Sequence, residues 1–395
     1  MKKDKGGESL PRNEEFGQGE KPTVLSPEER KKRRTAALGN AAVYLLYAVA
    51  LAVGFLSAFA RIDGLSIPKA EFWKKTLWIL FSVLCAAVLF IAGEGVHELG
   101  HLFFAKQYGF SVAGFSFWIY HEDRRAGKKR AFFPDAVAGN TALYPTAETD
   151  LTGFPSVVSG GLLFTGIFTA LCALLYFALP FTVARLVFSF WTVELAFLLV
   201  NLIPGLVPTS DGTLLLLMKR GGLRAANASL AVTASLAEGK TFAQIDEKLL
   251  SCEGAPDVFA APIAYAGYCR MIEKGNFSAA KILLDGIPED FFPQSEREKE
   301  EFFLLVAAGK EIGEEEKKRA EDALCDDPDS PSSLRVLYAF ALKNGENERA
   351  DLLLGTLKNR ISVWYLPGEA RSAFAAAEKL SAAFSRGAGA FPKRD

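Results

Sequence analysis

Long apolar runs most strongly constrain how this chain can fold. One run covers Ala36–Ala60, a second leads from about Thr76 to Lys106, and two more lie near Val157–Phe181 and Val183–Leu206. A helix needs about 20 consecutive apolar residues to cross the hydrocarbon core of a bilayer, and lipid cannot hydrogen-bond an exposed backbone. We therefore expect an all-α polytopic membrane protein with about four transmembrane helices in contact with the lipid bilayer.

Clusters of basic residues predict how these helices are oriented. Arg30–Arg34 directly precedes the first run, and a second cluster, Arg124–Arg130, lies between the second and third runs. Positive charge is retained on the cytoplasmic side of a membrane. We expect an integral, multi-pass protein, in the cell membrane if the chain is bacterial, whose N-terminus and C-terminal domain are both cytoplasmic.

Composition divides the chain into four segments. Residues 1–35 are rich in charged residues, Gly and Pro and should form a disordered tail, residues 36–222 should form the transmembrane domain, residues 223–386 are rich in Ala, Leu and Glu with helical periodicity, and residues 387–395 should be a flexible tail. The formal net charge of −1 provides no global positive field. Nucleic acid is therefore not an expected partner.

A metal-binding pattern lies late in the second apolar run, in the sequence His97-Glu98-Leu-Gly-His101. Two histidines at positions i and i+4 share one helix face and can both donate an imidazole nitrogen to one zinc ion. Glu98 lies beside them as the expected general base. Two chance histidines packed in a bundle would not need a glutamate between them, so we predict one Zn²⁺ per chain.

The third ligand is expected in the stretch Asn201-Leu-Ile-Pro204-Gly-Leu-Val-Pro-Thr-Ser-Asp211-Gly212. A polar segment broken by Pro and Gly is tolerated at membrane depth only where it is buried in protein or lines a wet cavity. The span with the histidines and the span that leads to Asp211 should both run from outside to inside and reach the same depth. Asp211 would complete three protein ligands and leave the fourth position to water.

Together, H-E-x-x-H in one span and Asn–Pro…Asp–Gly at the end of a later span resemble the site-2 protease family of intramembrane zinc metalloproteases, over roughly Phe81–Leu216. The resemblance identifies residues 36–222 as a transmembrane metalloprotease domain. It implies that the zinc ligands are His97, His101 and Asp211, that Glu98 activates the zinc-bound water, and that Asn201 holds or polarises the scissile carbonyl.

The sequence departs from the family pattern in two places. Two additional residues lie between Pro204 and Asp211, so the loop must bulge for Asp211 to reach the metal. Ser159-Gly160-Gly161 also stands where many relatives carry a Gly-Pro pair.

Two further carboxylates, Glu94 and Glu194, lie within the apolar runs on the same helix faces as the histidines and Asn201. Ionisable residues inside a membrane are functional candidates by default. We interpret both as support for the metal ligands or as part of a polar water path to the metal; a pore-facing residue without a catalytic role is the alternative.

A small β element is expected at the membrane surface. Val112–Tyr120 alternates and is rich in aromatic and β-branched residues, and Thr141–Tyr144 could be its partner strand. We interpret Val112–Tyr120 as an edge to which an extended client adds by β-pairing. The strand residues that would contact such a client are Val112, Gly114, Ser116 and Trp118.

The C-terminal segment contains three helix–turn–helix stretches, with turns at Gly275, Gly313 and Gly345. Their spacing resembles tetratricopeptide-like repeats of about 34 residues, although a plain helical bundle is an alternative. A repeat domain could bind a cytosolic protein partner on its concave face.

These features predict an intramembrane zinc metalloendopeptidase. It would cleave a peptide bond in or near a transmembrane segment of a client protein, as in regulated intramembrane proteolysis, or of a signal-peptide remnant. The competing hypothesis is a membrane scaffold or adaptor with a vestigial metal site and partner-binding helical repeats.

Overall fold

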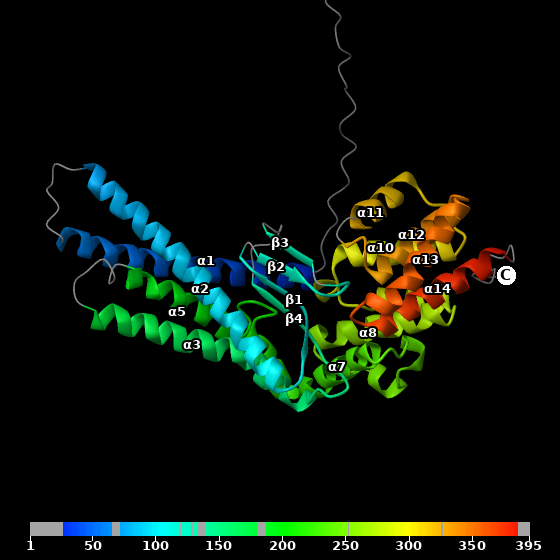
Figure 1. The fold of residues 1–395 in the computed structure, drawn as a ribbon, viewed down its shortest axis with the longest axis horizontal. Coiled ribbons are helices and arrows are strands. Elements are labelled where there is room, and N and C mark those ends of the chain that lie inside the picture. The colour runs from blue at the N-terminus through cyan, green and yellow to red at the C-terminus, as the bar shows by residue number, and fades with distance from the viewer. Residues whose placement is uncertain are drawn as a thin grey trace, which may run out of the picture.

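The computed structural model describes residues 27–64, 72–118, 120–127, 129–132, 139–179, 187–251, 253–324 and 327–385, and most of them are helical. Long apolar helices form one end of the molecule, a separate group of helices forms the other end, and a small sheet lies between them (Figure 1). Most of the two expected tails, residues 1–26 and 387–395, lies outside the described residues.

Three helices are long and apolar enough to cross a membrane. They are α1 (Pro27–Gly64), α2 (Phe72–Gln107) and α3 (Phe154–Ala178), and their apolar segments cover Ala37–Ala58, Thr76–Gln107 and Leu151–Ala178. These segments agree with the first three expected spans. Because α1 begins at Pro27, the last part of the expected N-terminal tail, residues 27–35, is helical instead.

In the described part of the fourth apolar run, which begins at residue 187, the helix is shorter than expected. A 3-10 turn, η2 (Phe188–Phe190), leads into α5 (Trp191–Leu202), and together they are too short for a full span. Helix α5 ends where Ile203 turns to an extended conformation before Pro204, as residues before proline tend to do. The turn expected at Pro180 lies outside the described residues.

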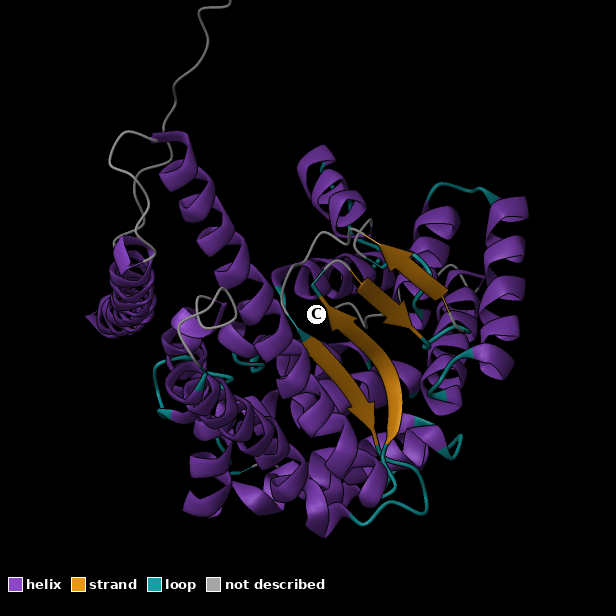
Figure 2. Cartoon of the chain, turned by 60° about the vertical axis from the view of Figure 1, so that its left-hand side comes forward, coloured by secondary structure: helices purple, strands orange, loops and turns teal. Residues whose placement is uncertain are grey.

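The four strands form one antiparallel sheet in the order β3-β2-β1-β4 (Figure 2). They are β1 (Ser111–Phe117), β2 (Tyr120–Asp123), β3 (Lys129–Phe132) and β4 (Asn140–Tyr144). The expected pairing of the first strand with Thr141–Tyr144 is confirmed. The expectation that this first strand is an edge is wrong, because β1 pairs with β2 on one side and with β4 on the other.

Helices α2 and α3 pack backbone against backbone. A Cβ atom added to Gly100 would lie 2.3 Å from the carbonyl oxygen of Gly160. Small residues permit this close approach between helices in a membrane, where van der Waals packing drives their association. The Gly160-Gly161 pair of α3 therefore brings that helix directly against the histidine motif of α2.

The C-terminal domain is entirely helical. Helix α6 (Asp211–Leu217) and a π turn, η3 (Met218–Gly222), lead into its first helix, α7 (Leu223–Ala237). The helices that follow are α8 (Asp257–Glu273), α9 (Phe277–Asp285), α10 (Gln294–Ala307), α11 (Glu314–Leu324), α12 (Pro331–Lys343), α13 (Asn347–Val363) and α14 (Pro367–Ser385). The domain also contains the short turns η4 (Phe242–Gln244), η5 (Glu247–Leu250) and η6 (Glu289–Phe291). A further short turn, η1 (Leu151–Gly153), lies outside this domain, directly before α3.

The same C-cap closes helices α7, α8, α10 and α12. Each ends in a glycine with positive φ, at Gly239, Gly275, Gly309 and Gly345, which are 36, 34 and 36 residues apart. At each site the glycine N–H and the next N–H return to the last turn of the helix, as in a Schellman motif. The turn of the second expected hairpin is thus at Gly309, because Gly313 directly precedes α11.

Candidate metal centre

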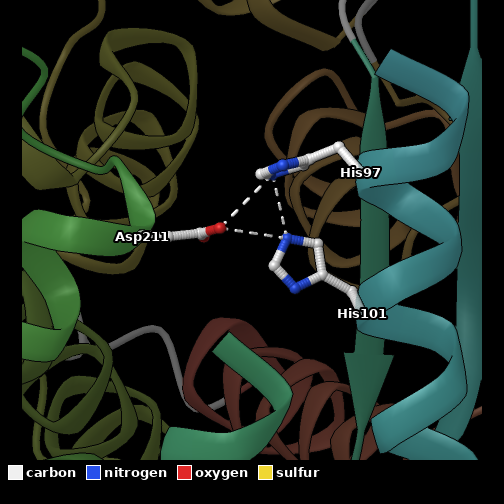
Figure 3. Close-up of side chains that lie close together, drawn as sticks. All are labelled: His97, His101 and Asp211. Atoms are coloured by element: carbon white, nitrogen blue, oxygen red, sulfur yellow. Dashed lines mark hydrogen bonds and ion pairs between the residues drawn. The ribbon is translucent and has the colours of Figure 1, made fainter. Parts of the chain in front are cut away.

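The structure brings together the three residues expected to hold a metal. His97 and His101 project from α2 toward Asp211, the first residue of α6 (Figure 3). Their Nε2 atoms are 3.2 Å apart, and Asp211 Oδ2 is 3.3 Å from that of His97 and 3.5 Å from that of His101. His97 and Asp211 are buried and His101 is partly buried, so this group could bind a metal ion.

The other nitrogen of each imidazole is held by α3. His101 Nδ1 lies 2.8 Å from the carbonyl oxygen of Val157, which can only accept a hydrogen bond. His97 Nδ1 lies 3.0 Å from the hydroxyl of Thr165, whose own hydrogen is donated to the carbonyl of Gly161. Both Nδ1 atoms must therefore carry the proton in the neutral rings. Both Nε2 atoms then present lone pairs.

The donor groups of this arrangement suit a bound cation. Two imidazole lone pairs and a carboxylate oxygen face one another, and Asp211 Oδ2 is buried without a hydrogen-bond donor among the described residues. Ligands about 2.0–2.1 Å from a tetrahedral zinc ion are about 3.3 Å from one another. The three measured separations scatter around this value, so both the donor types and their spacing fit such an ion.

Glycine at position 161 makes room for the two rings. A Cβ atom there would lie 2.6 Å from His101 Nε2 and 2.7 Å from His97 Cε1. Gly160 thus allows the close contact between α3 and α2, and Gly161 leaves space for the two imidazole rings.

The longer loop before Asp211 closes on itself. Pro204 and Val207 form an isolated bridge around Gly205, whose φ is +86°. The Thr213 hydroxyl accepts a hydrogen bond from the Gly205 N–H and donates one to the Val207 carbonyl. The two additional residues are absorbed in this turn, and Asp211 reaches the histidines.

The two carboxylates beside the histidines are held by the sheet. Glu98 is buried and accepts a hydrogen bond from the Thr141 hydroxyl of β4, and Glu94 accepts one from the Gly139 N–H at 2.5 Å. Glu94 thus binds the residue directly before β4, and its expected support of the metal ligands stays a prediction. The partners of the two histidines, Thr165 and Val157, were not identified from the sequence. Thr165 lies one helical turn after Gly161, and this position of its hydroxyl is the one local feature of the sequence that could have indicated a contact with His97.

The remaining candidate side chains do not contact the three ligands directly. Asn201 donates to the carbonyl of Phe197 one turn back in its own helix, while the Phe197 ring contacts the ring of His97. Glu194 is fully buried, neither oxygen has a hydrogen-bond partner in the described part of the chain, and Oε2 occupies the space beside Gly93 where a Cβ would lie.

The residues expected to meet a client lie in or after the internal strand β1. Val112, Gly114 and Ser116 belong to β1 and are paired on the sheet, whereas Trp118 follows the strand in a turn with φ +48°. Among the described strands, β4 is instead the edge strand beside the metal ligands, and its Thr141 donates a hydrogen bond to Glu98.

Comparison with known proteins adds no relative to this picture. No protein-family model matches the chain, and neither the characterised proteins nor the solved structures include a match.

Proposed function

We propose that this chain is an intramembrane zinc metalloendopeptidase of the site-2 protease type. Its substrate would be a peptide bond in or near a transmembrane segment of a client protein or a signal-peptide remnant. One observation carries the proposal: two imidazole lone pairs and a carboxylate oxygen converge late in an apolar helix, directly beside the buried Glu98.

The chemistry follows from the residues around this point. A bound zinc ion would polarise the scissile carbonyl and make a water molecule acidic enough to lose a proton near neutral pH. Glu98, oriented by Thr141, accepts that proton and passes it to the amine nitrogen as the C–N bond breaks. The hydroxyl of the water stays on the carbonyl carbon, so the products are a carboxylate and a free amine. Asn201 would have to leave its bond to Phe197 to reach the carbonyl oxygen.

The client must be unwound before it is cleaved, because helical peptide groups are engaged in their own hydrogen bonds. Strand β4 supports this step. It is an edge of the sheet, no described strand pairs with its outer side, and its Thr141 contacts Glu98. A client segment that adds to β4 in extended form would run past the catalytic glutamate.

The orientation and the helical domain are further parts of the proposal. Gly39, near the start of α1, approaches the carbonyl of Leu206 just before Asp211, so these two points lie at one end of the bundle. The basic clusters support a cytoplasmic location for that end. The four equivalent C-caps support a tetratricopeptide-like domain that binds a cytosolic protein partner, the role emphasised by the scaffold hypothesis.

Glu98→Gln tests the enzyme against the scaffold. The variant should retain about one zinc per chain, measured by mass spectrometry of the purified protein, and should lose cleavage of co-expressed single-span clients. Glu148→Gln, which changes an exposed carboxylate in the turn after β4, is the matched control and should cleave normally. Cleavage that survives Glu98→Gln, or wild-type protein without metal, would contradict the proposal.

A further inference from the structure

A cavity of about 470 Å³ lies between the sheet and the helical domain. Its floor is formed by strand residues, which include the small Ala113, Gly114 and Ser116 of β1 and Ala142 of β4 beside the larger Phe115 and Leu143, and one wall is formed by Tyr365 and Leu366 between α13 and α14. This volume falls in the range of about 300–1,000 Å³ that is typical of ligand-binding pockets.

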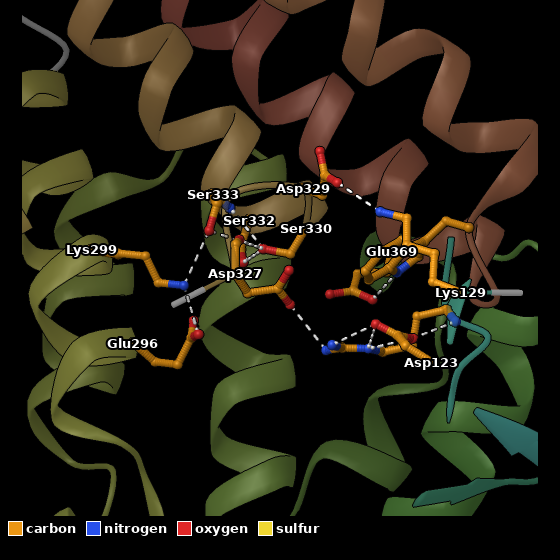
Figure 4. Close-up of polar contacts among 12 residues, drawn as sticks. Asp123, Lys129, Glu296, Lys299, Asp327, Asp329, Ser330, Ser332, Ser333 and Glu369 are labelled. Carbon is orange, nitrogen blue, oxygen red and sulfur yellow. Dashed lines mark hydrogen bonds and ion pairs between the residues drawn. The ribbon is translucent and has the colours of Figure 1, made fainter. Parts of the chain in front are cut away.

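The wall is attached to the sheet by specific contacts. Arg125 after β2 forms an ion pair with Asp327 at 3.0 Å, and Lys129 of β3 forms one with Asp329 at 3.0 Å (Figure 4). The Tyr365 N–H donates to the carbonyl of Arg125 at 2.7 Å. The helical domain therefore holds a defined position over the sheet.

Strand β4 presents its two faces to two different sites. Thr141 points to Glu98, whereas its neighbours Asn140 and Ala142 line the cavity. Successive side chains of a strand point to opposite faces of a sheet. A polypeptide paired with the open edge of β4 would continue this alternation, with every second side chain directed to the cavity.

We propose that the cavity is the specificity pocket for a client strand. The inference rests on the proposed function: the occupant is the extended client segment next to the scissile bond, and the helical domain selects it by forming the wall. The pocket favours large apolar or aromatic side chains, because Tyr144 and Tyr365 form an edge-to-face pair there, 5.1 Å between centroids, beside Leu366.

The charged groups at the cavity support an uncharged occupant. The Arg125 guanidinium already contacts the carboxylates of Asp123 and Asp327. Arg125 is the one arginine or lysine among the described lining residues, and it is already paired; a basic side chain would compete with it for both carboxylates and loosen the wall.

Photo-cross-linking tests occupancy without requiring cleavage. The full-length chain with Glu98→Gln would carry the photoreactive residue benzoylphenylalanine in place of Tyr365, a half-buried aromatic residue of the cavity wall, or at Leu352, which is 70% exposed elsewhere. The probe is a single-span protein with phenylalanines at alternate positions in the cytosolic turn of its span. Cross-links from position 365 and not from 352 support the pocket; equal cross-links at the two positions, or none at 365, overturn it.

Selectivity provides the second arm. The second probe carries phenylalanines in both registers and is cleaved by wild type. Changing the phenylalanines that point to the cavity to alanine should slow cleavage about tenfold or more, while the same change in the other register should have little effect. Thr233→Trp, which fills the cavity, should remove this preference, and Leu352→Trp should keep it. Equal effects in both registers would refute the pocket while leaving the peptidase intact, whereas cross-linking without wild-type cleavage would count against the peptidase.

Discussion

Replacing Gly161 by alanine should weaken zinc binding without unfolding the helices. The added Cβ would lie 2.6 Å from His101 Nε2 and 2.7 Å from His97 Cε1, and relaxed contacts of this type are about 3.5 Å. Both rings would have to move by about 1 Å. They cannot do so freely, because their Nδ1 atoms are held by groups of the same helix, α3.

The size of the effect follows from this geometry. Disturbing the partners that orient a metal ligand typically costs 10–100-fold in affinity, or about 1.4–2.7 kcal/mol. Alanine itself is favoured over glycine inside a helix by about 0.5–1 kcal/mol, so the helix should not be destabilised by its own backbone.

The assay is competition for zinc between the purified protein and a chromophoric chelator, with circular dichroism as a check of helix content. Gly166→Ala on the same helix is the control, because its Cβ would meet only Leu198 at 4.0 Å. Its affinity should equal that of wild type. If Gly161→Ala also binds zinc as tightly as wild type, the assignment of this triad as the metal site is refuted.

Three further predictions follow from individual contacts. Thr165→Val removes the acceptor of His97 Nδ1 and should lower zinc affinity about tenfold in the same assay, whereas Thr169→Val, whose hydroxyl has no partner among the described residues, should not. A double-mutant cycle with Arg125→Ala and Asp327→Ala, followed by thermal unfolding, should give a coupling of at most about 1 kcal/mol that disappears in high salt, because the guanidinium is 37% exposed; a salt-independent coupling would contradict this. Burial raises the pKa of Glu369 to about 6 from its usual 4.5, so the folded state binds this proton more tightly and the free energy of unfolding should fall as the pH rises from about 4.5 to 6. Glu369→Gln should remove about 2 kcal/mol of this pH dependence, measured by denaturant titrations at several pH values. An unchanged pH profile would show that the carboxyl is solvated.

Local patterns in the sequence predicted much of the fold and of the site. The lengths of the apolar runs located the three described helices that are long and apolar enough to cross a membrane, and the i, i+4 spacing of His97 and His101 placed both rings on one face. These properties depend on neighbours within one helix, where backbone geometry alone decides the outcome. The expected direction and depth of the membrane spans predicted Asp211 as the third ligand. The turn around Gly205 forms part of the loop between Asn201 and Asp211.

Contacts between distant segments were decided only by the tertiary structure. The sequence identified β1 but could not show that strands pair on both of its sides, because strand order depends on partners far along the chain. For the same reason it did not reveal Thr165 beside His97, Thr141 beside Glu98, or the cavity under Tyr365. Short stretches of sequence determine which residue types form the site. The protonation of the two histidines, the orientation of their rings and the neighbours of Glu98 are determined by packing between helices and strands that are distant in the sequence.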